Sequence, residues 1–196
     1  MEYVQGGYLT GAGIIEEVCN NRIQISDFDE KNVNPNSYNL RICGDNVKRL
    51  ITNTEVWTET YGIREHHEWI DTAKPIEYED MGPIEQIILE PNELYLVPTV
   101  EVVSSDYYIP LITGRSSCGR MGLQVHREAG FGDIGFCGRW TLQISVVKPM
   151  QLYSNMELAQ VYFAVPAGST AMKYHGKYQH SMSAEGSKIN LDFDKK

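Results

Sequence analysis

The sequence has no long apolar run, and no stretch of its 196 residues approaches the roughly 20 consecutive apolar residues of a membrane helix. Its first residues lack a basic region followed by an apolar core, so no secretory signal is expected. The cysteines show no Cys-x-x-Cys spacing, which argues against structural zinc and favours free thiols. They are Cys19, Cys43, Cys118 and Cys137. We therefore expect a cytoplasmic protein without zinc and without membrane contact.

Several motifs of nucleotide binding and catalysis are also missing. The phosphate-binding loop GxxxxGK[ST] does not occur. The zinc-deaminase signature, His-x-Glu with Pro-Cys-x-x-Cys, is absent as well. Ser116 and Ser117 lack the Gly-x-Ser-x-Gly context of a serine hydrolase. His66 and His67 are adjacent and cannot both point to one side of an extended chain, so no metal site is expected there.

Positive charge is scarce, because the formal net charge is −9. Duplex nucleic acids are bound through phosphate neutralisation by Lys and Arg, so no nucleic-acid partner is expected. Four arginines are nevertheless close in sequence: Arg115, Arg120, Arg127 and Arg139. If they converge, they could hold a small anionic ligand. The alternative is that each is a solvated surface charge.

Short apolar runs separated by turn residues predict a mainly β fold, either a sandwich or a barrel. Ile14, Ile15 and Val18 occur at helical spacing and predict one short helix over residues 11–20. The expected strands are residues 38–42, 87–89, 94–97, 100–103, 109–112, 140–147 and 160–165.

Two regions depart from this pattern. Residues 53–83 combine tryptophans, histidines and many acids without a clear period, which indicates an inserted hairpin or excursion. The chain beyond Pro166 is polar and rich in Gly and Ser. Such a tail is either disordered or a segment that orders over a ligand. The expected organisation is a β domain over residues 1–166, followed by a C-terminal lid or tail over residues 167–196.

The most informative segment runs from Ile112 to Gln143. It begins with residues suited to phosphate oxygens, because arginine forks and short hydroxyls donate several charge-assisted hydrogen bonds. These residues are Gly114, Arg115, Ser116, Ser117 and Arg120. A glycine-rich turn carrying one acid, Asp133, follows.

This order of residues resembles the dCTP deaminase and dUTPase family. Residues 114–123 match Gly-Arg-Ser-Ser-x-x-Arg-x-Gly-Leu without a gap, and residues 34–41 resemble an earlier Asn-Pro-x-Ser-Tyr element. The later matches are Val125-His126, Ala129, Asp133-x-Gly135-Phe136-x-Gly138, then Tyr153, Met156 and Gln160, and in the tail Lys177-Tyr178 and Ser187-Lys188-Ile189. The resemblance therefore covers most of the chain.

The resemblance implies a distorted β-barrel or jelly-roll-like fold of the dUTPase type, with a short N-terminal helix. It further implies a homotrimer with active sites between subunits, and Mg²⁺ bound through the substrate phosphates rather than by direct protein ligands. The implied substrates are dCTP or dUTP, with dTTP as a candidate inhibitor.

The resemblance also assigns roles to individual residues. Contacts to the triphosphate fall on Arg115, Ser116, Ser117 and Arg120. The Ala129 backbone and Phe136 frame the base and sugar. Asp133 lies by the sugar hydroxyl, and in dUTPases the acid at this place orients the attacking water. The tail contributes Tyr174, Lys177 and Tyr178.

Gln143 departs from the family pattern, because it stands where dCTP deaminases have their catalytic glutamate. Deamination at C4 of cytosine needs a group that carries a proton, which an amide cannot do. Three explanations are open. Gln143 is an engineered isostere of a natural glutamate, or Glu128 supplies the carboxylate, or the protein has kept only phosphate hydrolysis through Asp133. The corresponding functions are dCTP deamination, with or without hydrolysis to dUMP, dUTP diphosphatase activity, and nucleotide binding without catalysis.

Overall fold

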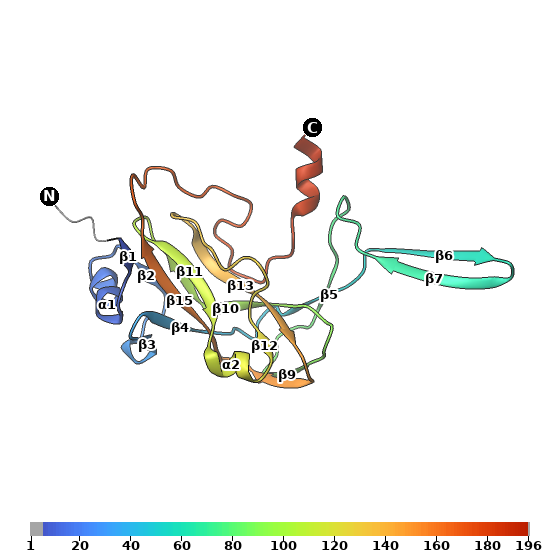
Figure 1. The fold of residues 1–196 in the computed structure, drawn as a ribbon, viewed down its shortest axis with the longest axis horizontal. Helices are drawn as coiled ribbons and strands as arrows, with labels where there is room; N and C mark the ends of the chain where they lie inside the picture. Colours follow the sequence, from blue (N-terminus) through green and yellow to red (C-terminus); the bar gives the residue numbers. More distant parts are fainter. Residues whose placement is uncertain (1–5, 196) are drawn as a thin grey trace.

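The computed structural model describes residues 6–195 and confirms a mainly β protein built of curled antiparallel sheets (Figure 1). The first sheet has the order β1-β15-β4-β3, with β11 also paired to β15. Its strands are β1 (Gly7–Tyr8), β3 (Val33–Asn34), β4 (Ser37–Arg41), β11 (Ile109–Gly114) and β15 (Glu157–Val165). The second sheet has the order β12-β13-β10-β5-β8, with β2 also paired to β10. Its strands are β2 (Gln24–Ile25), β5 (Lys48–Leu50), β8 (Tyr78–Asp80), β10 (Tyr95–Ser104), β12 (Leu123–Gln124) and β13 (Cys137–Val146).

Two strand pairs and a few short helices complete the description. The pairs are β9 (Gln86–Leu89) with β14 (Met150–Tyr153), and β6 (Thr54–Thr60) with β7 (Ile63–Trp69). The helices are α1 (Gly11–Cys19), α2 (Ser116–Arg120) and the 3-10 helices η1 (Glu30–Asn32) and η2 (Ile189–Lys195). None of the helices within residues 6–195 has the length and apolar character needed to cross a membrane.

The helix expected over residues 11–20 is confirmed as α1. Thr10 caps it, since its hydroxyl oxygen accepts a hydrogen bond from the Gly13 backbone N–H at 3.2 Å. Ile14 is fully buried and fixes the helix on the core. Helix α2 was not predicted from the sequence.

The prediction of two separate strands at 94–97 and 100–103 is wrong, because β10 runs through both. The register against β13 shifts between Pro98 and Val102. A shift normally leaves backbone groups unpaired, but side chains satisfy them here. The Thr99 hydroxyl donates to the Glu101 carbonyl oxygen at 2.8 Å and accepts from the Trp140 backbone N–H at 3.0 Å.

The two faces of strand β13 differ in burial. Trp140, Leu142 and Ile144 alternate into the core between the sheets. The intervening Thr141 and Gln143 lie on the other face and are only partly buried. This period of two is the ordinary consequence of strand geometry, and it presents alternate side chains to one side of the sheet.

The hairpin of β6 and β7 extends away from the rest of the molecule (Figure 1). Most of its residues are exposed. Val56 pairs with His67 and Trp57 with His66 across the two strands.

The chain beyond β15 packs against β13, although residues 166–188 form no helix or strand. The Arg139 N–H donates to the Ser181 carbonyl oxygen at 2.8 Å, and the His180 N–H donates to the Cys137 carbonyl oxygen at 2.8 Å. Ala184 is fully buried. The tail is therefore attached along the strand that carries Gln143.

Candidate functional site

A cavity of about 460 Å³ lies beside β13. Four groups of residues line it. Strand β13 contributes Arg139, Trp140, Thr141 and Gln143. The loop before β13 contributes Ala129, Phe131, Gly132, Asp133 and Phe136. The tail contributes Tyr174, Tyr178, Ser181, Glu185, Gly186 and Ser187. Tyr78, Leu94 and Leu96 complete the lining.

Gln143 is held at both its backbone and its side chain. It pairs with Leu96 of β10, and its backbone N–H donates to the Val125 carbonyl oxygen at 3.0 Å. Its side-chain oxygen Oε1 accepts a hydrogen bond from the Arg127 backbone N–H at 3.2 Å. A glutamate carboxylate could accept the same bond, because the acceptor atom is an oxygen in both side chains.

Close packing of the loop at Gly132 positions Asp133 at the cavity. A Cβ at Gly132 would lie 2.5 Å from Trp140 Cη2 and 2.8 Å from the Pro110 carbonyl oxygen. The Gly132 N–H donates to that same oxygen at 2.9 Å. Only glycine allows this approach, so a side chain at this position would displace the turn that carries Asp133.

One wall of the cavity is aromatic. Phe136 meets Trp140 edge to face, with ring centroids 5.6 Å apart, and meets Tyr174 in the same way at 5.8 Å. Within the tail, the Tyr178 N–H donates to the Tyr174 hydroxyl at 3.2 Å. Aromatic faces of this kind suit a flat ring such as a nucleobase.

The tail is also held at the cavity by hydrogen bonds to the body of the protein. The Glu185 N–H donates to the Thr141 hydroxyl at 3.0 Å, and the Ser187 N–H donates to the Tyr78 hydroxyl at 2.9 Å. Burial raises the pKa of Tyr78 above its ordinary value, which keeps this hydroxyl protonated. The Glu185 carboxylate forms an ion pair with Lys188 at 3.0 Å.

The segment expected to bind phosphate lies elsewhere. Within residues 6–195, none of Arg115, Ser116, Ser117 and Arg120 lines the cavity. Arg115 is half-buried at the start of α2, while the other three are exposed. Arg115 Nη1 bonds the Glu157 carboxylate at 2.8 Å and the Glu157 carbonyl oxygen at 3.0 Å.

The structure thus brings together half of the residues predicted from sequence. Those that line the cavity are Ala129, Asp133, Phe136, Gln143, Tyr174 and Tyr178. Glu128 is exposed and outside the lining of the described cavity. Lys177 is also outside it, where its ammonium group bonds the Lys188 carbonyl oxygen and the Asp192 carboxylate, each at 2.8 Å.

Thr141 and Glu185 line the cavity but were not predicted from the sequence. Strand alternation could have placed Thr141, since it lies two residues before Gln143 and therefore shares its face. Nothing in the sequence placed Glu185, because its contact with Thr141 joins residues far apart in the chain.

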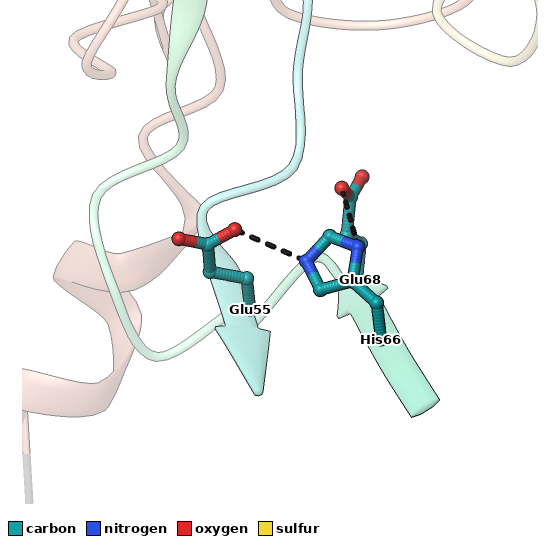
Figure 2. Close-up of side chains that lie close together, drawn as sticks. All are labelled: Glu55, His66 and Glu68. Atoms are coloured by element: carbon teal, nitrogen blue, oxygen red, sulfur yellow. Dashed lines mark hydrogen bonds and ion pairs between the residues drawn. The ribbon is translucent and has the colours of Figure 1, made fainter. Parts of the chain in front are cut away.

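A second cluster of titratable groups lies on the hairpin. Figure 2 shows the His66 imidazole between two carboxylates, with Nε2 3.1 Å from Glu55 and Nδ1 3.4 Å from Glu68. The three residues offer ligand atoms within 4.8 Å of one another, and all three are exposed. His67 Nε2 lies 3.2 Å from the Thr58 hydroxyl and 3.5 Å from the Glu65 carboxylate. The expectation that this histidine pair binds no metal stays a prediction.

Curated relatives resemble this chain over most of its length. A dUMP-forming dCTP deaminase of Clostridium acetobutylicum is 38% identical over 180 residues, covering 91% of this chain and 95% of the relative. One from Cytophaga hutchinsonii is 38% identical over 181 residues, covering 92% and 96%.

The fold also resembles a solved structure, that of 2'-deoxycytidine 5'-triphosphate deaminase from Agrobacterium tumefaciens. The TM-score is 0.57 at 20% identity, covering 82% of this chain and 48% of the other. At this identity the likeness supports the β fold alone. The family model described as dCTP deaminase-like matches residues 8–165. With this match, and with relatives of 38% identity over nearly the whole chain, the protein belongs to the dCTP deaminase-like family.

Proposed function

We propose that the chain binds dCTP in the cavity beside β13 and converts it to dUMP, ammonia and pyrophosphate. The observation that carries the proposal is the convergence of Gln143, Asp133 and the aromatic wall on one cavity, at the positions that the family resemblance assigns to catalysis and base binding. The relatives at 38% identity carry the name dCTP deaminase, dUMP-forming, which supports both half-reactions.

Different residues of the cavity bind the base and orient the attacking water. Phe136 and Tyr174 pack against the base, and the Ala129 backbone contacts its edge. Asp133 orients the water that attacks the triphosphate, because a carboxylate at the cavity rim can accept a proton from that water. Fixing both reacting groups in one cavity lowers the entropic part of the barrier.

The triphosphate is expected to meet residues from a neighbouring copy. Arg115 and its companions carry the donors suited to phosphate, yet they lie outside the cavity of their own chain. A homotrimer with sites at its subunit interfaces would bring these donors to the cavity of the neighbouring subunit, at three equivalent sites. The proposed assembly thus explains why one chain presents the two halves of the site apart.

Mg²⁺ is the proposed cofactor, held through the substrate phosphates. The chemistry of the cavity fits this ion, because its carboxylates are Asp133 and Glu185 and no histidine or cysteine belongs to its described lining. Mg²⁺ prefers oxygen ligands and keeps several waters, and when bound it would neutralise charge on the phosphates. We further propose dTTP as a competing ligand. The four cysteines are free thiols, which fits the reducing cytoplasm that we propose as the location.

A second candidate function is dUTP diphosphatase activity without deamination. The observation that favours it is Gln143 itself, because hydrolysis of the triphosphate needs phosphate donors, metal and a water-orienting acid but no proton carrier at this position.

Product analysis with dCTP and with dUTP in the presence of Mg²⁺ tests the proposal. Ammonia and dUMP from dCTP support it. Pyrophosphate from dUTP alone, with dCTP bound but unchanged, supports the second candidate. Binding of both nucleotides without turnover contradicts both and indicates a regulatory binder. The variant Asp133→Asn is expected to retain dCTP binding and lose pyrophosphate release.

A further inference from the structure

We propose that Glu185, in the C-terminal tail, carries the proton for deamination that Gln143 cannot carry. This inference rests on the proposed deaminase function and adds a residue to it. Glu185 lies in the lining of the same cavity as Gln143 and Asp133, although it comes from a separate segment of the chain.

The need for such a group follows from the chemistry of Gln143. Its amide neither gains nor loses a proton near neutral pH. Its Oε1 atom already accepts a hydrogen bond from the Arg127 N–H at 3.2 Å. Gln143 can therefore orient a ligand, but the reaction requires another side chain to take a proton from water and return it.

The backbone of Glu185 is fixed on the strand that carries Gln143. Its N–H donates to the Thr141 hydroxyl at 3.0 Å. Thr141 and Gln143 are two residues apart on β13 and both line the cavity. The tail cannot slide freely along this strand, because Ala184 is fully buried and the Arg139 N–H donates to the Ser181 carbonyl oxygen at 2.8 Å.

The side chain of Glu185 is held as well. Lys188 Nζ lies 3.0 Å from its carboxylate and also donates to the Lys177 carbonyl oxygen at 3.0 Å. The Glu185 side chain is 28% exposed, so it is partly shielded from solvent yet still open to the cavity. A carboxylate in this setting can exchange a proton with a water inside the cavity.

The other carboxylates near the site are less suited. Asp133 and Glu185 are the only two acids in the described lining of the cavity, and Asp133 is assigned to water at the triphosphate. Glu128, the replacement considered from sequence, is exposed and does not line the described cavity.

The proposed step balances without any further reactant. Glu185 takes one proton from water as the water oxygen bonds to C4 of cytosine, and it delivers that proton to ring nitrogen N3. The second water proton then passes through Glu185 to the amino nitrogen. The bond between C4 and that nitrogen breaks, ammonia leaves, the N3 proton stays on uracil, and the carboxylate is regenerated.

The test compares Glu185→Gln with Glu128→Gln and with Glu16→Gln, measuring ammonia release from dCTP and dCTP affinity. Glu16 is exposed on α1, outside the cavity lining, so its variant controls for loss of a surface charge. We expect Glu185→Gln to lower ammonia release by about 10²-fold or more, the usual effect of a missing general base, with nearly unchanged dCTP affinity. Full activity of Glu185→Gln, or loss only in Glu128→Gln, overturns the proposal.

A double variant separates proton transfer from a structural role of the tail. Glu185→Gln is made in the wild-type chain and in the Gln143→Glu background. If Glu185 carries the proton, the Gln143→Glu chain no longer needs it. Glu185→Gln should then cause a large fold-loss of ammonia release in the wild-type chain and a much smaller one in the Gln143→Glu chain. An equal fold-loss in both backgrounds shows that Glu185 only holds the tail and overturns the proposal.

The proposed function and this inference can fail separately. Ammonia release by Gln143→Glu but not by the wild-type chain overturns the role of Glu185 and leaves the dCTP site intact. Absence of ammonia from both chains, with dCTP bound, contradicts the deaminase function itself.

Discussion

Arg115 and Glu157 form an ion pair, with Arg115 Nη1 2.8 Å from the Glu157 carboxylate. The same carboxylate accepts a hydrogen bond from Asn39 Nδ2 at 2.8 Å. Both charged side chains are more than a third exposed, so the pair contributes little to folding stability. The ion pair instead positions the Arg115 guanidinium at the start of α2 in the absence of phosphate.

We expect Arg115→Ala to weaken dCTP binding while leaving deoxycytidine binding unchanged. A hydrogen bond to a charged group is worth about 1.5–3 kcal/mol, which corresponds to a loss of about 10- to 150-fold in affinity. Calorimetric titration with both ligands measures this. Glu157→Gln should give a smaller loss, since it frees the guanidinium but keeps its charge. Arg64→Ala, on the hairpin, is the matched control. Equal losses for nucleoside and nucleotide would show Arg115 to be structural.

We expect Gln143→Glu to raise the rate of ammonia release from dCTP. A carboxylate at this position can accept the Arg127 N–H as Gln143 Oε1 does, so the loop should keep its place while a proton carrier is added. A steady-state ammonia assay measures the gain. A variant that binds dCTP normally yet gains no activity would mean that residue 143 does not face the reacting atoms.

We expect the active species to be a homotrimer near three times 22.2 kDa. The reason is the separation of Arg115 from the cavity of its own chain. Dilution should lower activity per chain, and nucleoside triphosphate should oppose dissociation by linkage. Light scattering across a concentration series measures both effects. A fully active monomer would contradict the shared site.

Stability at high pH should depend on Tyr108. Burial, and then its 2.7 Å hydrogen bond to Glu17, raise the pKa of Tyr108 from 10.0 to about 12. Because the folded-state pKa is raised, the folded chain holds this proton more tightly than the unfolded chain. The stabilisation is therefore complete below pH 10 and is lost as pH rises towards 12.

The matched variant is Tyr108→Phe. Its deficit in unfolding free energy should be largest below pH 10 and should shrink between pH 10 and 12. Denaturant unfolding at several pH values measures the difference between the two chains. A deficit that does not change with pH would show that Glu17 and burial do not affect the Tyr108 proton.

Local patterns predicted the parts of the fold that depend on local chemistry. Helix α1 followed from apolar spacing, and β13 followed from a β-branched and aromatic run. The continuity of β10 did not, because the register shift at Pro98 is stabilised by the long-range bond between Trp140 and Thr99. No local pattern predicted that bond.

The site shows the same division. The family resemblance pointed to Asp133, Phe136 and Gln143, and the structure places all three on one cavity. For the tail, the sequence left two alternatives: disorder, or a lid that orders over a ligand. Its packing depends on contacts such as that of Glu185 with Thr141, which join distant segments and have no signature in either one.

The most direct test of the account is the product balance from dCTP with Mg²⁺ and the unaltered chain. We expect ammonia, pyrophosphate and dUMP in equal amounts, with ammonia release lowered by about 10²-fold or more in Glu185→Gln. Pyrophosphate without ammonia, or dCTP recovered unchanged after binding, would contradict it.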